Sequence, residues 1–331
     1  MLNIALVGFG YWGPNIARNI NANENLNLHT ICDMIDDNLQ KAQKLYANSV
    51  NYEKDYNKVL EDENINAVAI ATQTSSHYKL IKQALLASKD VYVEKPFTST
   101  LQEAQELEDL AKKQNKIIHI DHIMIFHPAI KKIKELISSD ELGDILYFNF
   151  TRRSLGQFRK DVSSMWDLAV HDLSIIDYLM QGVTPKQISA VGEKFYNPKD
   201  SVTFLTLKFN NFLAQIESNW LSPIKERTIT VVGSKKMLVY DDLKLNDKLT
   251  VFEKSVEVLN GGARCDVFND NYSIKTHEYG SYSPYIKPED ALFNSIEHFR
   301  NSVLSKQESI CNPAQAIRIH KILEQADTHL A

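Results

Sequence analysis

The stretch Ile4-Ala-Leu-Val-Gly8-Phe-Gly10-Tyr-Trp-Gly13-Pro14 lies near the start of the chain and decides the fold. It combines a short apolar run, three glycines in the spacing G-x-G-x-x-G and a proline suited to a first helical turn. Glycines in this spacing allow a tight turn and a close approach of backbone to a pyrophosphate, which the N–H groups of the following helix bind. The stretch therefore predicts a strand, a phosphate-binding loop and a helix.

The first 122 residues alternate short apolar runs with helical patterns. Continuous apolar runs are typical of strands buried on both faces, and strand–helix alternation is typical of a doubly wound parallel sheet. The runs are Leu2–Val7, Leu26–Cys32, Ala67–Ala71, Val91–Val93 and Ile117–Ile120. Helices are expected near Pro14, Asp37–Tyr46, His77–Ser88 and from Ser99, the last with a capping box to Gln102. We expect residues 1–122 to form a Rossmann dinucleotide-binding domain.

The pattern changes after His122. Helices are expected over Pro128–Ile137 and from about Trp166 to Met180, and strands dominate from Ile188 to Tyr240. Residues 261–290 have the composition of a long surface segment, and two helices are expected to close the chain. We expect residues 123–331 to form an α+β domain, an antiparallel sheet with helices on one face. The fold class is therefore α/β with two domains.

Length and composition support this organisation and exclude several classes of protein. A chain of 331 residues is longer than one hydrophobic core usually serves. The net charge is −5 and the Lys and Arg residues are scattered, which argues against nucleic-acid and membrane partners. No apolar run is long enough for a signal sequence or a membrane span. Cys32, Cys265 and Cys311 form no CxxC motif, which argues against disulfides and zinc, so we expect a cytoplasmic protein.

Asp33 lies at the end of the second apolar run, where a carboxylate accepts hydrogen bonds from the adenosine ribose hydroxyls. A 2′-phosphate at roughly 4 Å would be repelled by about 1 kcal/mol in water and about 4 kcal/mol at a surface-like dielectric. Met34 and Ile35 follow instead of Arg or Lys. We therefore expect the cofactor to be NAD and not NADP.

Glu94-Lys95-Pro96 follows the run Val91–Val93, at the carboxyl end of a parallel strand where α/β sheets bind ligands. A lysine there is a compact cation that can hold a substrate oxygen. The alternative is a solvated lysine at a strand end, which is common for this residue type.

Asp167 and His171 are four residues apart on an expected helix and therefore share one face. An ionised Asp beside the imidazole orients it and keeps it basic, as a proton acceptor from an alcohol requires. Taken alone, such a pair is more often a surface ion pair or a cap.

The segment His119-Ile-Asp121-His122 contains residue types that bind metals. Strand alternation places His122 on the opposite face from the other two, so we expect no metal site. His122, at the end of the last Rossmann strand, is instead expected to hydrogen-bond a substrate. Arg152 follows the run Ile145–Phe150 and is a candidate for holding an anionic substrate group, with an exposed structural arginine as the alternative.

Together these residues resemble the Gfo/Idh/MocA family of sugar oxidoreductases, over nearly the whole chain. The matching stretches are Gly8-Phe-Gly10-Tyr-Trp-Gly13-Pro-Asn, Ala71-Thr72 with His77, Glu94-Lys95-Pro96, His122 with Phe126 and Pro128, and Asp167-x-x-x-His171-Asp172. The chain departs from the family at Gln73-Thr74, where a proline-rich pair is common. The family implies a Rossmann domain followed by a domain with a large, open, mostly antiparallel sheet.

The resemblance assigns catalysis to Lys95, Asp167 and His171, which with His122 and Arg152 form the expected substrate site. It also leads us to expect a cis Lys95–Pro96 peptide bond. The expected cofactor contacts come from the glycine-rich loop and three strand ends: Gly8, Phe9, Gly10, Tyr11, Trp12, Gly13, Asp33, Thr72, His77, Glu94 and Lys95.

The implied reaction is hydride transfer between a sugar carbinol carbon and NAD. His171 would take the hydroxyl proton, Asp167 would orient it and Lys95 would hold the reacting oxygen. The GYWGPN start and the segment Trp166–Asp172 resemble members that act on C3 of a UDP-N-acetylhexosamine or its uronic acid. Two alternatives stay open: a glycoside-cleaving relative that retains its NAD, and a non-catalytic dinucleotide sensor, against which Lys95 and His171 weigh.

Val202–Phe209 carries apolar residues on both alternations of the expected strand. Helices can cover only one face of the sheet, and an uncovered apolar face usually marks an association surface. We therefore expect a homodimer or homotetramer built on this sheet.

Overall fold

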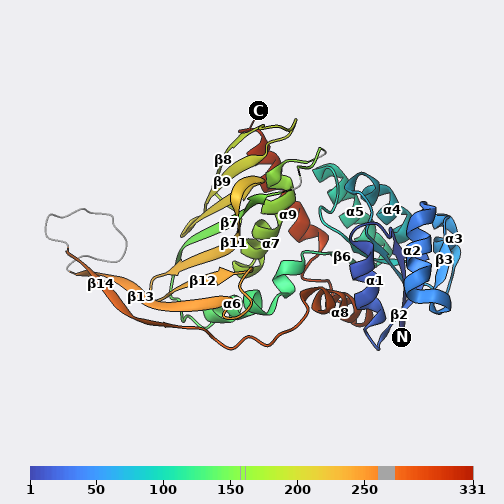
Figure 1. The fold of residues 1–331 in the computed structure, drawn as a ribbon, viewed down its shortest axis with the longest axis horizontal. Helices are drawn as coiled ribbons and strands as arrows, with labels where there is room; N and C mark the ends of the chain where they lie inside the picture. The colour runs from blue at the N-terminus through green and yellow to red at the C-terminus, as the bar shows by residue number, and fades with distance from the viewer. Residues whose placement is uncertain (157, 161, 260–272, 331) are drawn as a thin grey trace. The chain divides into compact units, whose positions relative to one another are not determined.

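The computed structural model describes residues 1–156, 158–160, 162–259 and 273–330. The chain divides into two compact units (Figure 1): unit 1 comprises Met1–His127 and Glu289–Lys321, and unit 2 comprises Pro128–Pro288 and Ile322–Ala331. The expected fold class is confirmed, since one unit holds a parallel sheet and the other a mostly antiparallel sheet. No helix in these described ranges is both long and apolar enough to cross a membrane.

Unit 1 is built on six parallel strands in the order β3-β2-β1-β4-β5-β6. The strands are β1 (Leu2–Val7), β2 (Leu26–Cys32), β3 (Asn51–Glu53), β4 (Ala67–Ile70), β5 (Asp90–Val93) and β6 (Ile118–Ile120). The central strand β1 pairs with both β2 and β4, so the strand order reverses there. Ligands of doubly wound sheets bind at the carboxyl ends of the strands around such a reversal.

Helices cover both faces of this sheet because alternate residues of each strand point to opposite faces. One face packs against α1 (Gly13–Asn21), α2 (Asp36–Tyr46) and α8 (Ala291–Ser305). The other packs against α3 (Tyr56–Glu61), α4 (Thr74–Leu86), α5 (Leu101–Gln114) and the first part of α9 (Pro313–Asp327).

Helix α8 corrects the expected domain boundary. The change of pattern after His122 predicts that all later residues belong to the second domain, but residues 289–321 belong to unit 1. Ile296 and Phe299 of α8 are buried in the same core as Ile4 and Leu6 of β1. The apolar stripe of α8 predicts that the helix packs against a core. Tertiary contacts decide which of the two sheets it covers.

Helix α5 begins one residue later than expected, so the predicted Ser99–Gln102 capping box was wrong. The N-cap is Thr100, whose Oγ1 accepts the Glu103 N–H at 3.2 Å while the Glu103 carboxylate accepts the Thr100 N–H at 3.2 Å. A carboxylate in the first turn also interacts favourably with the helix dipole, which an amide cannot do to the same degree.

The described residues of unit 2 form an eight-stranded sheet in the order β14-β13-β12-β11-β7-β10-β9-β8, and among them only β7 and β10 pair in parallel. The strands are β7 (Ile145–Leu155), β8 (Gln187–Glu193), β9 (Val202–Lys208), β10 (Leu213–Asn219), β11 (Leu221–Gly233), β12 (Met237–Asp241), β13 (Leu249–Leu259) and β14 (Ser273–Tyr282). Strand β14 lies within residues 261–290, which were expected to form a long surface segment; residues 261–272 of that segment lie outside the described residues.

The two faces of this sheet differ. Phe150, Leu205, Ile216 and Ile229 form a buried row across four neighbouring strands. Helices α6 (Pro128–Ser138) and α7 (Val170–Leu179) lie along the sheet (Figure 1). The opposite face mixes polar side chains with exposed apolar ones, such as Phe204.

Candidate active site

The glycine-rich loop after β1 is shaped by its three glycines. Gly8 has φ of +96°, and a Cβ there would lie 2.7 Å from the carbonyl oxygen of Ala71. A Cβ on Gly13 would lie 2.2 Å from the carbonyl oxygen of Gly8, whereas a Cβ on Gly10 would meet open space. The loop is therefore tight against β4 and α1 but open at Gly10. This open backbone at a helix N-terminus fits the pyrophosphate of a dinucleotide.

Asp33 fixes this loop to the end of β2. Its Oδ2 accepts the backbone N–H of Phe9 at 2.7 Å and the side-chain N–H of Asn38 at 3.0 Å. Its Oδ1 accepts the backbone N–H of Ile35 at 2.8 Å. A carboxylate accepts about four hydrogen bonds, so acceptor capacity for a ribose hydroxyl is left at Oδ1.

The three aromatic residues of the loop differ in their positions. Phe9 is buried in the core of unit 1, so only its backbone faces the loop. Tyr11 is exposed. Trp12 packs against the same core, and its Nε1 is buried with no hydrogen-bond partner in the described part of the chain. The expected cofactor contacts of these residues stay predictions.

His77 connects the loops that follow β4 and β5. Its Nδ1 lies 2.9 Å from the carbonyl oxygen of Pro96, and its Nε2 lies 3.2 Å from that of Thr72. Burial lowers the pKa of this imidazole, which the two carbonyl oxygens oppose. His77 is fully buried, so it holds Thr72 and the Lys95 loop in place. Its expected contact with the cofactor stays a prediction.

The loop after β5 contains Glu94, Lys95 and a cis Lys95–Pro96 bond, which confirms that expectation. Oε1 of Glu94 is buried and has no hydrogen-bond partner among the described residues. Burial raises the pKa of the Glu94 carboxyl well above its usual value, and the charge of the neighbouring Asp121 adds to the effect. In the sequence, Asp121 is recognisable only as a residue type that binds metals.

His122 follows β6, with a side chain 1% exposed. Neither ring nitrogen has a hydrogen-bond partner in the described ranges. Burial lowers the His122 pKa to about 3, and the positive charges of Lys95 and His320 act in the same direction. The imidazole is therefore neutral at physiological pH and offers one donor and one acceptor to a ligand. The described residues contain no group of three or more His, Cys, Asp or Glu side chains arranged to hold a metal.

The predicted catalytic pair lies in unit 2, and its helix is not regular. Met165–Ala169 forms a π-helical turn, after which α7 begins at Val170. Asp167 lies in this turn, and its Oδ1 is 3.2 Å from Nε of Arg159. His171 lies in the first turn of α7 and is half-buried. Single π-helical turns occur frequently at functional sites.

Arg152 points to the helix-covered face of the sheet and is only 8% exposed, so it is not an exposed structural arginine. Its Nε donates to Oδ1 of Asp172 at 2.7 Å. Burial raises the pKa of Asp172 to about 6, while the charges of Arg152 and Arg227 oppose the shift. Arg152 therefore supports α7 next to His171. Its expected contact with a substrate anion stays a prediction.

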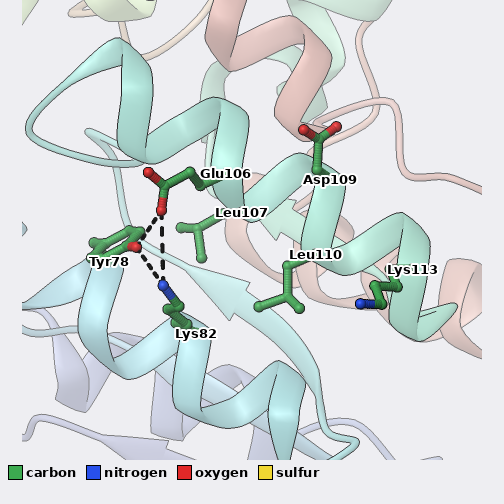
Figure 2. Close-up of a pocket in the computed structure, with 7 residues that line it drawn as sticks. All are labelled: Tyr78, Lys82, Glu106, Leu107, Asp109, Leu110 and Lys113. Atoms are coloured by element: carbon green, nitrogen blue, oxygen red, sulfur yellow. Dashed lines mark hydrogen bonds and ion pairs between the residues drawn. The ribbon is translucent and has the colours of Figure 1, made fainter.

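A cavity of about 330 Å³ lies elsewhere in unit 1, between α4 and α5. Figure 2 shows Tyr78 and Lys82 of α4 facing Glu106 of α5. The Tyr78 hydroxyl donates to Glu106 at 2.5 Å, and Lys82 donates to the Tyr78 hydroxyl at 2.7 Å. These polar groups satisfy one another across the helix surface. The candidate chemistry lies instead in the loops after β1, β2, β4, β5 and β6.

Comparison with known protein families supports a dinucleotide site at these loops. Residues 2–122 match the oxidoreductase family with an NAD-binding Rossmann fold, and residues 130–239 match the Gfo/Idh/MocA C-terminal domain. The chain belongs to the Gfo/Idh/MocA family. It is therefore an NAD(P)-binding oxidoreductase.

Relatives with stated activities include two dehydrogenases. A UDP-N-acetylglucosamine 3-dehydrogenase of Acidithiobacillus ferrooxidans is 24% identical over 265 residues, which cover 77% of this chain and 75% of the relative. A myo-inositol 2-dehydrogenase of Thermotoga maritima is 26% identical over 256 residues, covering 73% and 76%. The solved structure of a UDP-N-acetylglucosamine 3-dehydrogenase from the former organism matches with a TM-score of 0.79 at 21% identity, covering 99% and 97% of the two chains. That similarity shows a shared fold.

Proposed function

We propose that this protein is an NAD-dependent dehydrogenase that transfers a hydride between a ring carbinol carbon of a sugar and nicotinamide. The observation that carries the proposal is the cluster at the carboxyl ends of β5 and β6. There Lys95, the buried Oε1 of Glu94 and the neutral ring of His122 occupy the half of the sheet opposite to Asp33. Asp33 would hold the adenosine ribose of a dinucleotide bound across the reversal, and this cluster would then lie on the nicotinamide side.

Asp33 supports NAD as the preferred cofactor. Its carboxylate is held in place by three protein donors and keeps acceptor capacity for a ribose hydroxyl. A 2′-phosphate at the same position would face this carboxylate. The residues that follow, Met34 and Ile35, are exposed and uncharged.

The proposed mechanism gives a separate role to each of three residues. NAD, when bound, accepts the hydride. Lys95 holds the reacting oxygen and stabilises its negative charge, His171 takes the hydroxyl proton, and Asp167 orients His171. The carbinol carbon must approach the nicotinamide to about 3–3.5 Å, so the main contribution of the protein is positioning.

The proposed substrate is a nucleotide-activated N-acetyl sugar or its uronic acid, oxidised or reduced at C3. The relative that acts on UDP-N-acetylglucosamine supports this choice, and the inositol dehydrogenase supports a ring hydroxyl more generally. His122 would hydrogen-bond the sugar, since it offers a neutral donor and acceptor. Arg152 would hold an anionic group of the substrate.

We further propose that the protein forms a homodimer or homotetramer through the unit 2 sheet. Val191 and Phe204 are register partners on β8 and β9, and they are 68% and 43% exposed. Leu213 on β10 is also exposed. Apolar groups on a broad, uncovered sheet face favour association with a second copy.

The experiment that tests the function is a panel of UDP-sugars, free sugars and inositols incubated with NAD, with NADH formation followed by absorbance. The proposal expects NADH with at least one sugar and the largest kcat/KM with a UDP-N-acetylhexosamine or its uronic acid. Preference for an inositol would overturn the choice of substrate. A glycoside cleaved without NADH release, by protein purified with bound NAD, would favour the glycoside-cleaving alternative.

A further inference from the structure

Two carboxyl groups, Glu94 and Asp121, lie side by side where β5 and β6 end. The strands are parallel with Val93 opposite Ile120, and the Asp121 N–H donates to the Val93 carbonyl oxygen at 2.8 Å. The next residue is therefore Glu94 on β5 and Asp121 on β6, and the two carboxyl groups lie within hydrogen-bonding reach of each other. A hydrogen bond between two carboxyl groups requires a proton on one of them. The question is which residue carries it.

The hydrogen bonds around Asp121 answer this question. The Ser295 hydroxyl of α8 donates to Oδ1 of Asp121 at 2.9 Å. A hydroxyl has one hydrogen, so Nε2 of His119, 3.0 Å from the Ser295 oxygen, must donate to it. The Tyr92 hydroxyl, 3.1 Å from the same oxygen, is also hydrogen-bonded to Asp121. All of these protons point toward Asp121.

The hydrogen bonds at Nδ1, the other ring nitrogen of His119, are consistent with donation from Nε2. Its Nδ1 lies 2.8 Å from the Ser309 hydroxyl, whose oxygen also accepts the Cys311 N–H at 3.0 Å. With the proton of His119 on Nε2, Nδ1 accepts the Ser309 proton. Burial lowers the His119 pKa well below its usual value, so the ring is neutral and has one N–H to give. The donors form one ordered series that ends at Asp121.

We propose that Glu94 is a neutral carboxylic acid that donates to an ionised Asp121, which makes Asp121 a positioning residue for the Glu94–Lys95 segment. The unpartnered Oε1 of Glu94 is then a carbonyl oxygen, available as a neutral acceptor for a donor group of the bound ligand. The pKa directions agree. Burial raises the pKa of both groups, but hydrogen bonds from Tyr92, Glu94 and Ser295 and the charge of Lys95 act to lower that of Asp121.

The consequence for catalysis rests on the proposed role of Lys95. With Glu94 neutral, this buried corner contains one positive charge, on Lys95, and one negative charge, on Asp121. An ionised Glu94 would add a second negative charge next to Lys95 and would weaken its stabilisation of the reacting oxygen. Asp121 therefore keeps Glu94 in a state that leaves the local charge balanced.

The proton itself can be observed by infrared spectroscopy of the full-length protein at pH 8. The carbonyl band of a protonated carboxylic acid is expected in the wild type and is expected to disappear in Glu94→Gln. The matched control is Glu63→Gln, at an exposed position, which should keep the band. This readout does not depend on turnover, so it stands even if the substrate panel fails. A wild-type spectrum without the band, or a band that persists in Glu94→Gln, would overturn the proposal.

A second measurement identifies which residue carries the proton. The amide introduced by Glu94→Gln can reproduce the donor and the acceptor of a neutral acid, whereas the amide introduced by Asp121→Asn places an N–H group where donors converge. NAD binding by calorimetry should therefore weaken about tenfold more in Asp121→Asn than in Glu94→Gln. Affinity better preserved in Asp121→Asn would place the proton on Asp121 and contradict the assignment.

Discussion

Arg152 on β7 donates from Nε to Oδ1 of Asp172 on α7 at 2.7 Å. Asp172 directly follows His171 in the sequence. Both side chains are buried, at 8% and 1% exposure. The sheet thereby fixes the first turn of the helix that carries the proposed proton acceptor. A buried ion pair of this kind contributes more to a defined geometry than to net stability, because desolvation offsets much of the attraction.

Asp172 gives a pH-dependent stability. Its pKa is raised from 3.8 to about 6 in the folded protein, mainly by burial. A raised pKa means that the folded state binds this proton more tightly, so the contribution is fully present below pH 3.8 and is lost as pH rises through 6. Two pKa units correspond to about 3 kcal/mol. Urea unfolding of the wild type should therefore show that Asp172 contributes more to the free energy of unfolding at pH 4.5 than at pH 8.

The variant Asp172→Asn removes that titration and should flatten the pH dependence. Because Asn resembles the protonated form of Asp172, the stability of the variant should be closest to that of the wild type at pH 4.5, where Asp172 is largely protonated. The matched control is Asp109→Asn, at an exposed position on α5, which should parallel the wild type. An Asp172→Asn curve that also parallels the wild type would refute the assignment.

Asp33 should determine cofactor preference. Replacing it by Ala removes the acceptor for the Phe9 N–H and the charge that faces a 2′-phosphate. We expect kcat/KM for NAD to fall about tenfold or more and the NAD-to-NADP ratio to approach one, as measured by steady-state kinetics with both cofactors. The control Asp37→Ala, at an exposed position on α2, should leave the ratio unchanged. Equal wild-type turnover with NADP would show that Asp33 is misplaced.

His122 should act as a neutral hydrogen-bonding group. His122→Phe removes both ring nitrogens at similar size, so kcat/KM should fall about three- to tenfold, the effect of one neutral hydrogen bond. Its pKa of about 3 means that the wild-type and variant pH profiles should have the same shape between pH 5 and 9. If the fall in kcat/KM at low pH disappears in His122→Phe, His122 titrates during catalysis.

The exposed face of the unit 2 sheet should hold the oligomer together. Phe204→Glu places a charge in the centre of the proposed contact and should produce a monomer at micromolar concentration, as measured by light scattering. Lys244→Glu, an exposed site outside the strands, is the control and should keep the oligomer. A monomeric wild-type protein contradicts the proposed association.

Local patterns were sufficient to predict five of the six described strands of unit 1 and the loop from Gly8 to Gly13. The short strand β3 was missed, because Asn51–Glu53 is not an apolar run. Continuous apolar runs and glycine spacing depend on neighbours in the sequence, so they can be recognised without a structure. The strands β13 and β14 were missed, because their alternation includes many exposed charged and polar residues and resembles a surface segment.

Tertiary contacts could not be predicted in the same way. The sequence does not reveal that α8 returns to unit 1, or that Ser295 reaches Asp121. The Glu94–Asp121 pair had one usable signal, since both residues directly follow neighbouring parallel strands. The π-helical turn at Asp167 had none, because its composition is that of an ordinary helix.

The central claim is that His171 takes the proton of a sugar hydroxyl while NAD accepts the hydride. The most direct measurement compares NADH formation and NAD binding in the wild type and in His171→Ala, with the best sugar from the panel. We predict that kcat falls by at least about a hundredfold while the Kd for NAD changes less than about threefold, because the cofactor is held by the Gly8–Gly13 loop and Asp33. Wild-type turnover in His171→Ala would contradict the account.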